Sequence, residues 1–267
     1  MLDFLQVVKR EPKPRQTGFS HVLDKGLGIR QVQDLLETAG EFIDIIKLGW
    51  GTGYVTNNLA DKVAVYQKAG IPVCFGGTLL ELAIAQGKFD DYRRTVKRLN
   101  LSHVEFSTGV LDMEIEKKAE FIRQLAEDFI VLAEVGSKDE NVAVEPFRWV
   151  EEIKILLQAG AWKVIAEARE SGTVGLYHQT GEVRLGLIEE IISAIDPEYL
   201  IFEAPQKRQQ VWFLKQFGPS VNLGNIATDD VIPLETLRLG LRGDTMPDFQ
   251  LKVWKPRSII KDMSGNR

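Results

Sequence analysis

Short apolar runs alternate along the chain with longer segments in which apolar residues recur at helical spacing. The runs are mostly continuous, as expected of parallel strands that are buried on both faces. The helical segments end at residues such as Gly40, Gly70 and Gly160, since glycine suits the left-handed conformation that follows a helix. We therefore predict eight strands with helices between them, at residues 19–24, 42–47, 71–75, 103–107, 129–134, 162–167, 199–203 and 220–223.

Eight strand–helix units in a chain of this length match one α/β fold, the (β/α)8 or TIM barrel. A doubly wound open sheet is the rival architecture, but no Gly-x-Gly-x-x-Gly turn follows the first predicted strand. We predict a single barrel domain over residues 1–267, with an N-terminal extension over about residues 1–17 and a C-terminal tail over about residues 247–267. We expect the tail to pack on the barrel or to dock on a neighbouring subunit of a homo-oligomer.

The composition of the chain argues against several classes of protein. The net charge of -5 gives no sign of the broad basic surface that binds nucleic acid. Cys74, the one cysteine, lies inside an apolar run, which excludes a disulfide framework and predicts a buried small hydrophobe. The first residues lack the basic stretch and apolar segment of a signal peptide, and we predict no membrane span. We expect a cytoplasmic enzyme with no nucleic-acid or membrane partner.

Strands four to seven each end on a glutamate. These residues are Glu105, Glu134, Glu167 and Glu203. Because the C-terminal ends of barrel strands meet at one face, the carboxylates are expected to lie close together, and buried charges are costly unless they are paired or bind a metal. Two interpretations stay open, a divalent metal site or a structural ion-pair network. The candidate basic partners in such a network are Lys25, Lys47, Lys138 and Arg169.

The turns after the second and third predicted strands are rich in glycine. Trp50 and Gly51 follow Lys47, and Gly76 and Gly77 follow the third strand. Glycines let backbone N–H groups approach an anion closely, so both turns are candidates for substrate binding. A tight turn with a packed Trp50 is the alternative for the first of them.

Later loops supply further candidates. Lys138 follows Glu134 by four residues, where it could transfer a proton or remain a solvated loop residue. Arg169 opens a long loop with Ser171 and Gly172, and its guanidinium suits a phosphate or a carboxylate. The loop after the eighth strand commonly holds phosphate in barrels, and the candidates there are Asn222, Gly224 and Asn225.

Other charged and polar residues are assigned ordinary structural roles. His21, His103 and His178 lack metal-ligand spacing, so we expect them to pack or to lie on the surface. Arg238 lies four residues before Arg242 on a predicted helix, and we expect it to form surface ion pairs.

Motifs spread over most of the chain form a specific combination. They are DKGLG at 24–28, KLGWGT at 47–52, GGTL at 76–79, EVG at 134–136, RESG at 169–172, FEAP at 202–205, NLGNI at 222–226 and LRLGLRGDT at 237–245. In these motifs the chain resembles the phosphosulfolactate synthase family. The resemblance implies a TIM barrel that adds sulfite to phosphoenolpyruvate with Mg²⁺, giving (2R)-3-phosphosulfolactate, the reaction that begins coenzyme M synthesis in methanogens.

The resemblance also implies roles for individual residues. Lys138 would be the general acid, while Lys25, Lys47 and Arg169 would neutralise the anionic groups of the substrates. The strand-end glutamates would hold Mg²⁺. Two residues next to strand ends, Asp24 and Ser107, join the predicted substrate-binding set. The chain departs from the expected family pattern at Thr108, where we expect an acidic residue, and at Ser137, where we expect a lysine.

Two other functions are consistent with the same barrel. One is a Schiff-base aldolase acting on a phosphorylated substrate, with Lys47 or Lys138 as the nucleophile. The other is a non-catalytic barrel with a role in stress tolerance. The charged strand ends argue against the latter, because a scaffold does not need them.

Overall fold

The computed structural model describes residues 4–136, 145–168 and 171–250. Its eight strands are β1 (Ser20–Asp24), β2 (Ile45–Leu48), β3 (Val73–Phe75), β4 (His103–Phe106), β5 (Ile130–Val135), β6 (Ala161–Ala166), β7 (Leu200–Glu203) and β8 (Leu223–Ala227). They pair in parallel in the order β3-β2-β1-β8-β7-β6-β5-β4. β3 and β4 are the two end strands of this order. The N–H of Gly77, just after β3, donates to the Glu105 carboxylate on β4 at 2.8 Å. The sheet thus forms a nearly closed barrel.

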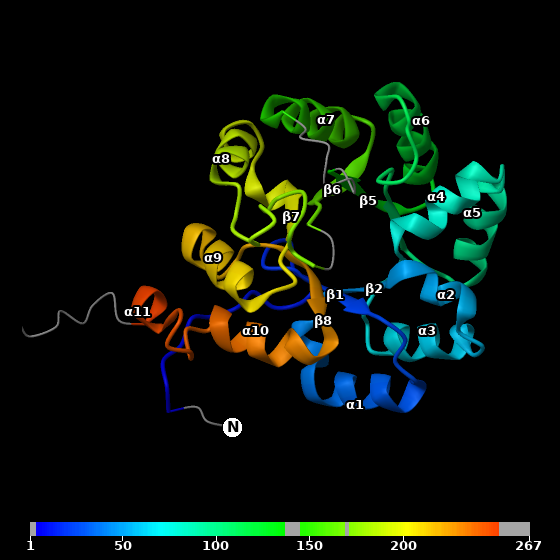
Figure 1. The fold of residues 1–267 in the computed structure, drawn as a ribbon. Helices are drawn as coiled ribbons and strands as arrows, with labels where there is room; N and C mark the ends of the chain where they lie inside the picture. The colour runs from blue at the N-terminus through cyan, green and yellow to red at the C-terminus, as the bar shows by residue number, and fades with distance from the viewer. Residues whose placement is uncertain (1–3, 137–144, 169–170, 251–267) are drawn as a thin grey trace, which may run out of the picture.

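Helices surround the strands (Figure 1). The α-helices are α1 (Ile29–Ala39), α2 (Thr52–Val55), α3 (Leu59–Lys68), α4 (Gly77–Ala85), α5 (Phe89–Arg98), α6 (Ile115–Ala126), α7 (Pro146–Gln158), α8 (Leu185–Ala194), α9 (Lys207–Phe217), α10 (Val231–Arg238) and α11 (Met246–Phe249). Short 3-10 turns are η1 (Gly40–Phe42), η2 (Gly49–Gly51), η3 (Pro197–Tyr199) and η4 (Thr228–Asp230). The predicted (β/α)8 barrel is confirmed. Among the described helices, none combines the length and the apolar character that crossing a bilayer requires.

Alternation along the strands produces two hydrophobic layers. The larger cluster joins the outward faces of the strands to the helices, as Val22 and Ile46 illustrate. The smaller cluster fills the barrel, since its members come from six positions around the ring. These are Phe19, Ile45, Cys74, Leu132, Ile165 and Ile201. The buried, apolar placement predicted for Cys74 is confirmed.

The charged residues lie two positions beyond the interior apolar ones. Lys47 follows Ile45, Glu134 follows Leu132 and Glu203 follows Ile201 at this spacing. A separation of two residues keeps a side chain on the same face of a strand. The barrel interior therefore changes from an apolar layer to a charged layer toward the C-terminal ends of the strands.

The predicted position of the eighth strand, at 220–223, is wrong. It overlaps β8 only at Leu223, and β8 continues to Ala227. Its pairing with β1 passes from Ser20↔Leu223 to Val22↔Ile226, so one extra residue is accommodated as a β-bulge. The backbone of Asn225 in this bulge has φ of 53°, a left-handed value that hydrophobic patterning does not reveal.

The described part of the N-terminal extension packs against the N-terminal end of the barrel. Arg10 pairs with Glu235 at 2.7 Å, and Arg15 pairs with Asp44 at 3.0 Å. The surface ion pairing expected for Arg238 is wrong, since its buried guanidinium donates to the carbonyls of Pro219, Val221 and Phe19. Burial lowers the pKa of Arg238 to about 9.

Candidate active site

Lys47 lies at the centre of a group of carboxylates at the C-terminal ends of the strands. Its Nζ is 3.0 Å from Glu105 Oε1, 3.5 Å from Glu203 Oε1 and 3.8 Å from Glu134 Oε2. The four residues come from β2, β4, β7 and β5, and all are buried. The structure therefore brings together Lys47 and three of the four predicted metal ligands.

Burial and the neighbouring charges shift the pKa values of Lys47 and Glu203. Burial on its own would lower the pKa of Lys47, but the carboxylates of Glu105, Glu203 and Glu134 outweigh it and hold that pKa well above its ordinary value. Burial, together with repulsion from Glu134 and Glu105, raises the pKa of Glu203 to about 7. The neighbouring Lys47 ammonium opposes this shift without cancelling it. Within the described residues, the Lys47 ammonium thus faces the carboxylates of Glu105, Glu134 and Glu203.

Backbone N–H groups orient two of the carboxylates. Gly77 donates to Glu105 Oε1 at 2.8 Å, and Ala168 donates to Glu203 Oε2 at 2.9 Å. A Cβ at Gly77 would lie 2.5 Å from the hydroxyl oxygen of Ser107, so the close approach requires glycine there. The Gly77 N–H predicted to bind a substrate anion instead binds an anionic side chain of the protein itself.

Ser107 is held by a residue that the sequence did not single out. Its hydroxyl donates to the carboxylate of Glu81, which lies buried on α4. The same carboxylate accepts the N–H groups of Val110 and Leu111 at 2.8 and 3.1 Å. Glu81 therefore fixes the start of the β4–α6 loop beside the charged group. The signal available in the sequence was an acidic residue within the apolar stretch Leu79–Ala85.

The assignment of Asp24 to substrate binding is contradicted by its contacts. Both of its oxygens are engaged within the chain: Oδ1 accepts the N–H groups of Gly26 and Leu27 at 2.8 Å, and Oδ2 lies 2.6 Å from Lys62 Nζ and 2.9 Å from Tyr66 Oη. Asp24 is fully buried toward α3. Neighbouring residues of a strand point to opposite faces. Leu23 approaches Gly49 on one face of β1, so Asp24 points to the other face.

Lys25 and Trp50 lie together just beyond β1 and β2. The Lys25 ammonium is 5.1 Å from the centroid of the Trp50 ring, in a cation–π contact. Trp50 is 52% exposed, so the packed alternative for this side chain is wrong. The consecutive left-handed residues Trp50 (φ 53°) and Gly51 (φ 73°) turn the chain sharply after Lys47 and Leu48. A Cβ added at Gly76 would lie 3.5 Å from Lys47 Cε.

The three candidates on the eighth strand do not lie in the loop that follows it. Asn222 lies at the N-terminal end of the barrel, where its side chain accepts from Phe19 N and donates to the carbonyl of Leu200. Gly224 faces the interior, because a Cβ there would approach Ile201. Asn225 occupies the bulge. The assignment of Asn222 to substrate binding is therefore wrong. A Cβ at Gly224 would lie 3.6 Å from Glu203 Cγ, so Gly224 adjoins the charged group, and the roles of Gly224 and Asn225 stay predictions.

The described part of the β6–α8 loop packs against the β7–α9 segment. Gln206 and Gln209 donate to the carbonyls of Ser171 and Gly172. Tyr177 donates its hydroxyl to the carbonyl of Glu203 at 2.6 Å. This loop is therefore held against the strand that carries Glu203.

Three further predicted residues complete the account. Glu167 directly follows β6, is buried, and donates its N–H to the carbonyl of Val135 at 3.0 Å. Lys138 and Arg169 lie outside the described residues, so their roles stay predictions. Carboxylate oxygens are the donors that Mg²⁺ prefers, and Glu105, Glu134 and Glu203 bring such oxygens together from three strands around Lys47.

The chain is similar to known proteins over most of its length. The sequence model of the (2R)-phospho-3-sulfolactate synthase (ComA) family matches residues 8–244. The phosphosulfolactate synthase of Bacillus subtilis is 43% identical over 249 residues, 92% of this chain and 99% of that protein. The phosphosulfolactate synthase of Methanocaldococcus jannaschii is 43% identical over 86% of this chain and 94% of that protein.

Among solved structures, a 3-hexulose-6-phosphate synthase aligns with a TM-score of 0.52, covering 82% of this chain and 98% of that chain at 15% identity. At that identity the match supports the barrel fold alone. The family match and the two synthases cover most of the chain and agree with each other. The chain belongs to the (2R)-phospho-3-sulfolactate synthase family and is an enzyme of that family.

Proposed function

We propose that the chain adds sulfite to phosphoenolpyruvate and gives (2R)-3-phosphosulfolactate. Family membership supports this reaction. The observation that carries the proposal is the Lys47 ammonium surrounded by the carboxylates of Glu105, Glu134 and Glu203 at the C-terminal end of the barrel. Active sites of this fold are built at that end.

The proposed reaction places new negative charge on the substrate. The sulfur lone pair of sulfite forms a bond to the methylene carbon, and the carbon–carbon π pair moves toward the carboxylate of the substrate. Lys138 then gives its ammonium proton to the adjacent carbon from one face, and regains a proton from water. Stabilising the developing charge is the largest contribution expected of the site.

Mg²⁺ is the cofactor that we propose for this charge. Glu134, Glu167 and Glu203 would hold it, with Glu105 as a further oxygen donor at the same strand ends. When bound, the ion supplies a Lewis acid for the carboxylate of the substrate. Lys47 is already surrounded by carboxylates, so we assign it to charge balance within the site. Lys25 and Arg169 are assigned to the anionic groups of the substrates.

The state of Lys47 argues against the Schiff-base alternative. A lysine nucleophile must lose its proton, whereas the neighbouring carboxylates hold the pKa of Lys47 well above its ordinary value despite burial. Borohydride trapping with a phosphorylated substrate is therefore expected to leave Lys47 unmodified. The cytoplasmic location and the homo-oligomer stay predictions.

Mass analysis of a reaction mixture tests the proposed function. The protein is incubated with phosphoenolpyruvate, sulfite and Mg²⁺, in parallel with mixtures that lack sulfite or contain Lys138→Ala protein. We expect a product with the mass of phosphoenolpyruvate plus HSO₃⁻, formed only in the complete wild-type mixture. Folded protein that leaves phosphoenolpyruvate unchanged under these conditions would contradict the proposal.

A further inference from the structure

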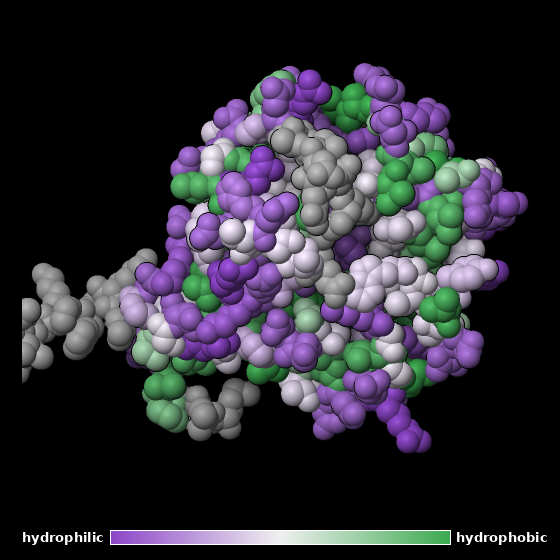
Figure 2. Space-filling model, viewed as in Figure 1, coloured by the Kyte–Doolittle hydropathy of each residue, from purple (hydrophilic) through white to green (hydrophobic). Residues whose placement is uncertain are grey.

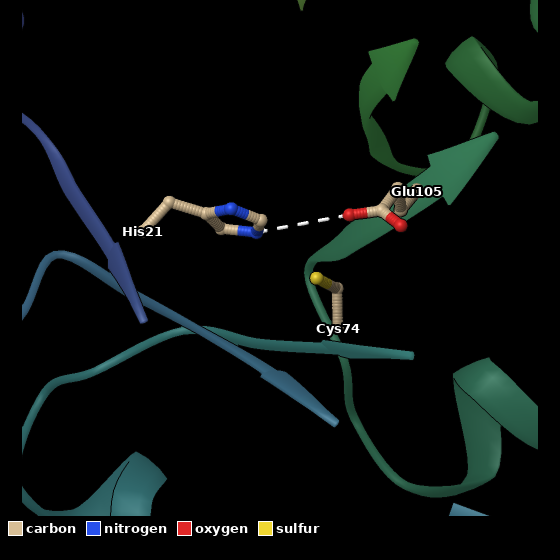
Figure 3. Close-up of side chains that lie close together, drawn as sticks. All are labelled: His21, Cys74 and Glu105. Atoms are coloured by element: carbon tan, nitrogen blue, oxygen red, sulfur yellow. Dashed lines mark ion pairs between the residues drawn. The ribbon is translucent and has the colours of Figure 1, made fainter. Parts of the chain in front are cut away.

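Below Lys47, three side chains with different ligand atoms point toward one another inside the barrel. His21 comes from β1, Cys74 from β3 and Glu105 from β4 (Figure 3). One ligand atom from each lies within 4.8 Å of the others, and His21 Nε2 is 3.8 Å from Glu105 Oε2. All three residues are buried, with exposed fractions of 0–1%. They form a compact nitrogen, sulfur and oxygen donor set.

The hydrogen bonding of this group is incomplete. Within the described residues, neither ring nitrogen of His21 has a hydrogen-bond partner, and nor does Glu105 Oε2. The other oxygen of Glu105 is engaged by Gly77 N–H and Lys47. A buried polar atom left unpaired costs about 1–3 kcal/mol, so three of them at one place indicate a missing binding partner.

A cation accounts for these atoms better than another hydrogen-bond donor does. Both ring nitrogens of His21 are buried without a hydrogen-bond partner among the described residues, and a neutral imidazole offers one of them as a lone-pair donor. Glu105 brings a carboxylate into this space, and its Oε2 is the oxygen that Gly77 N–H and Lys47 do not engage. A cation bound beside His21 and Cys74 would be attracted by this oxygen.

The donor types select the class of metal. A thiolate and an imidazole favour borderline or soft transition metals, whereas Mg²⁺ takes oxygen ligands. Tetrahedral sites with Zn–N and Zn–S bonds of about 2.0 and 2.3 Å place their donor atoms roughly 3.3–3.8 Å apart. The observed separations, at most 4.8 Å, need only small side-chain movements to reach these values.

We propose that His21, Cys74 and Glu105 form a transition-metal site within the barrel, suited to Zn²⁺ or Co²⁺. Glu105 binds through Oε2 and keeps Oε1 on Gly77 N–H and Lys47. The Cys74 thiol loses its proton to solvent as the sulfur–metal bond forms. The fourth coordination position remains for water. This site differs from the oxygen site proposed above for Mg²⁺ in its imidazole and thiolate ligands, and the two share Glu105. The transition-metal site does not depend on the proposed reaction.

Cobalt absorption tests the site cleanly, because the chain has one cysteine and three histidines. Metal-depleted full-length protein is titrated with Co²⁺ and its absorption is recorded. We expect a thiolate-to-cobalt charge-transfer band that saturates at one equivalent and that can arise only from Cys74. Stoichiometric Zn²⁺ should remove the band, and a large excess of Mg²⁺ should leave it. No band in folded protein with excess Co²⁺, or its removal by Mg²⁺, would overturn the proposal.

Three variants complete this test. Cys74→Ser should abolish the band, and His21→Gln should weaken Co²⁺ binding at least tenfold. His178→Gln is the matched control: it removes an exposed imidazole and should leave the titration unchanged. Circular dichroism establishes that each variant is folded, and the Zn²⁺ and Mg²⁺ competitions on wild-type protein remain decisive if a variant is not. An unchanged band in folded Cys74→Ser, or unchanged affinity in folded His21→Gln, would contradict the site.

Discussion

The two ends of the barrel handle buried charge in opposite ways. At the N-terminal end, Arg15 meets Asp44 at 3.0 Å and Arg10 meets Glu235 at 2.7 Å, so each of these carboxylates has a cation of its own. At the C-terminal end, within the described residues, the Lys47 ammonium is shared by the carboxylates of Glu105, Glu134 and Glu203. Paired charges hold elements together, whereas unbalanced ones raise pKa values and favour the binding of ions from solution.

A cavity of about 590 Å³ opens at the N-terminal end and is lined in part by Phe19, His103 and Trp162. Burial lowers the pKa of His103 to about 4, so its imidazole is neutral there. The surface on the side viewed in Figure 1 is mainly hydrophilic over α9 and α10, and hydrophobic residues are exposed near α4 (Figure 2). The arrangement of buried charges identifies the candidate active site at the C-terminal end.

The largest expected effect is the loss of activity on metal removal. Dialysis against a chelator should abolish sulfite addition, because the developing charge on the substrate then lacks its counterion. Adding Mg²⁺ back should restore the rate. Full turnover in metal-free protein would show that the excess carboxylates serve another purpose.

The next effect concerns the proposed acid. Lys138→Ala should slow turnover by about 10²–10⁴-fold, the scale of a lost general acid. Steady-state kinetics at saturating substrate measure this directly. A rate within a factor of three of wild type would remove Lys138 from the role.

A matched pair of variants compares the two ends. Lys47→Met and Arg15→Met each remove one buried cation, and each should lower the free energy of unfolding by about 3–5 kcal/mol. Only Lys47→Met should also reduce turnover, by at least about 10²-fold. Urea unfolding and kinetics on both proteins provide the measurement. Equal turnover in the two variants would mean that the two ends do not differ in function.

The smallest effect is a pH dependence of stability. The pKa of Glu203 is raised in the folded protein to about 7, so its stabilising contribution is complete below the unfolded pKa and is lost as pH rises through 7. Between pH 4.5 and 8, metal-free wild type should therefore lose on the order of 1–3 kcal/mol relative to Glu203→Gln. Urea unfolding in chelator at both pH values tests this. Parallel pH profiles would show that Glu203 does not titrate in this range.

The sequence predicts the barrel and the carboxylates, because both follow from regular spacing. Strand-end glutamates can be recognised from apolar runs, and parallel topology then places them at one face. That reasoning omitted the alternation of side chains along a strand. Asp24 follows Leu23 on the same strand and therefore points outward, which the alternation could have indicated. The bulge at Asn225 and the support of Ser107 by Glu81 depend on contacts between distant segments. The same is true of the grouping of His21 with Cys74, which no local spacing reveals.

A crystal structure of the protein grown with Mg²⁺ and phosphoenolpyruvate tests the central claim most directly. The account predicts substrate density at the C-terminal end of the barrel, with the ion coordinated by oxygens of Glu134, Glu167 or Glu203. Substrate bound instead in the N-terminal cavity, or at the C-terminal end with no cation on these glutamates, would contradict it.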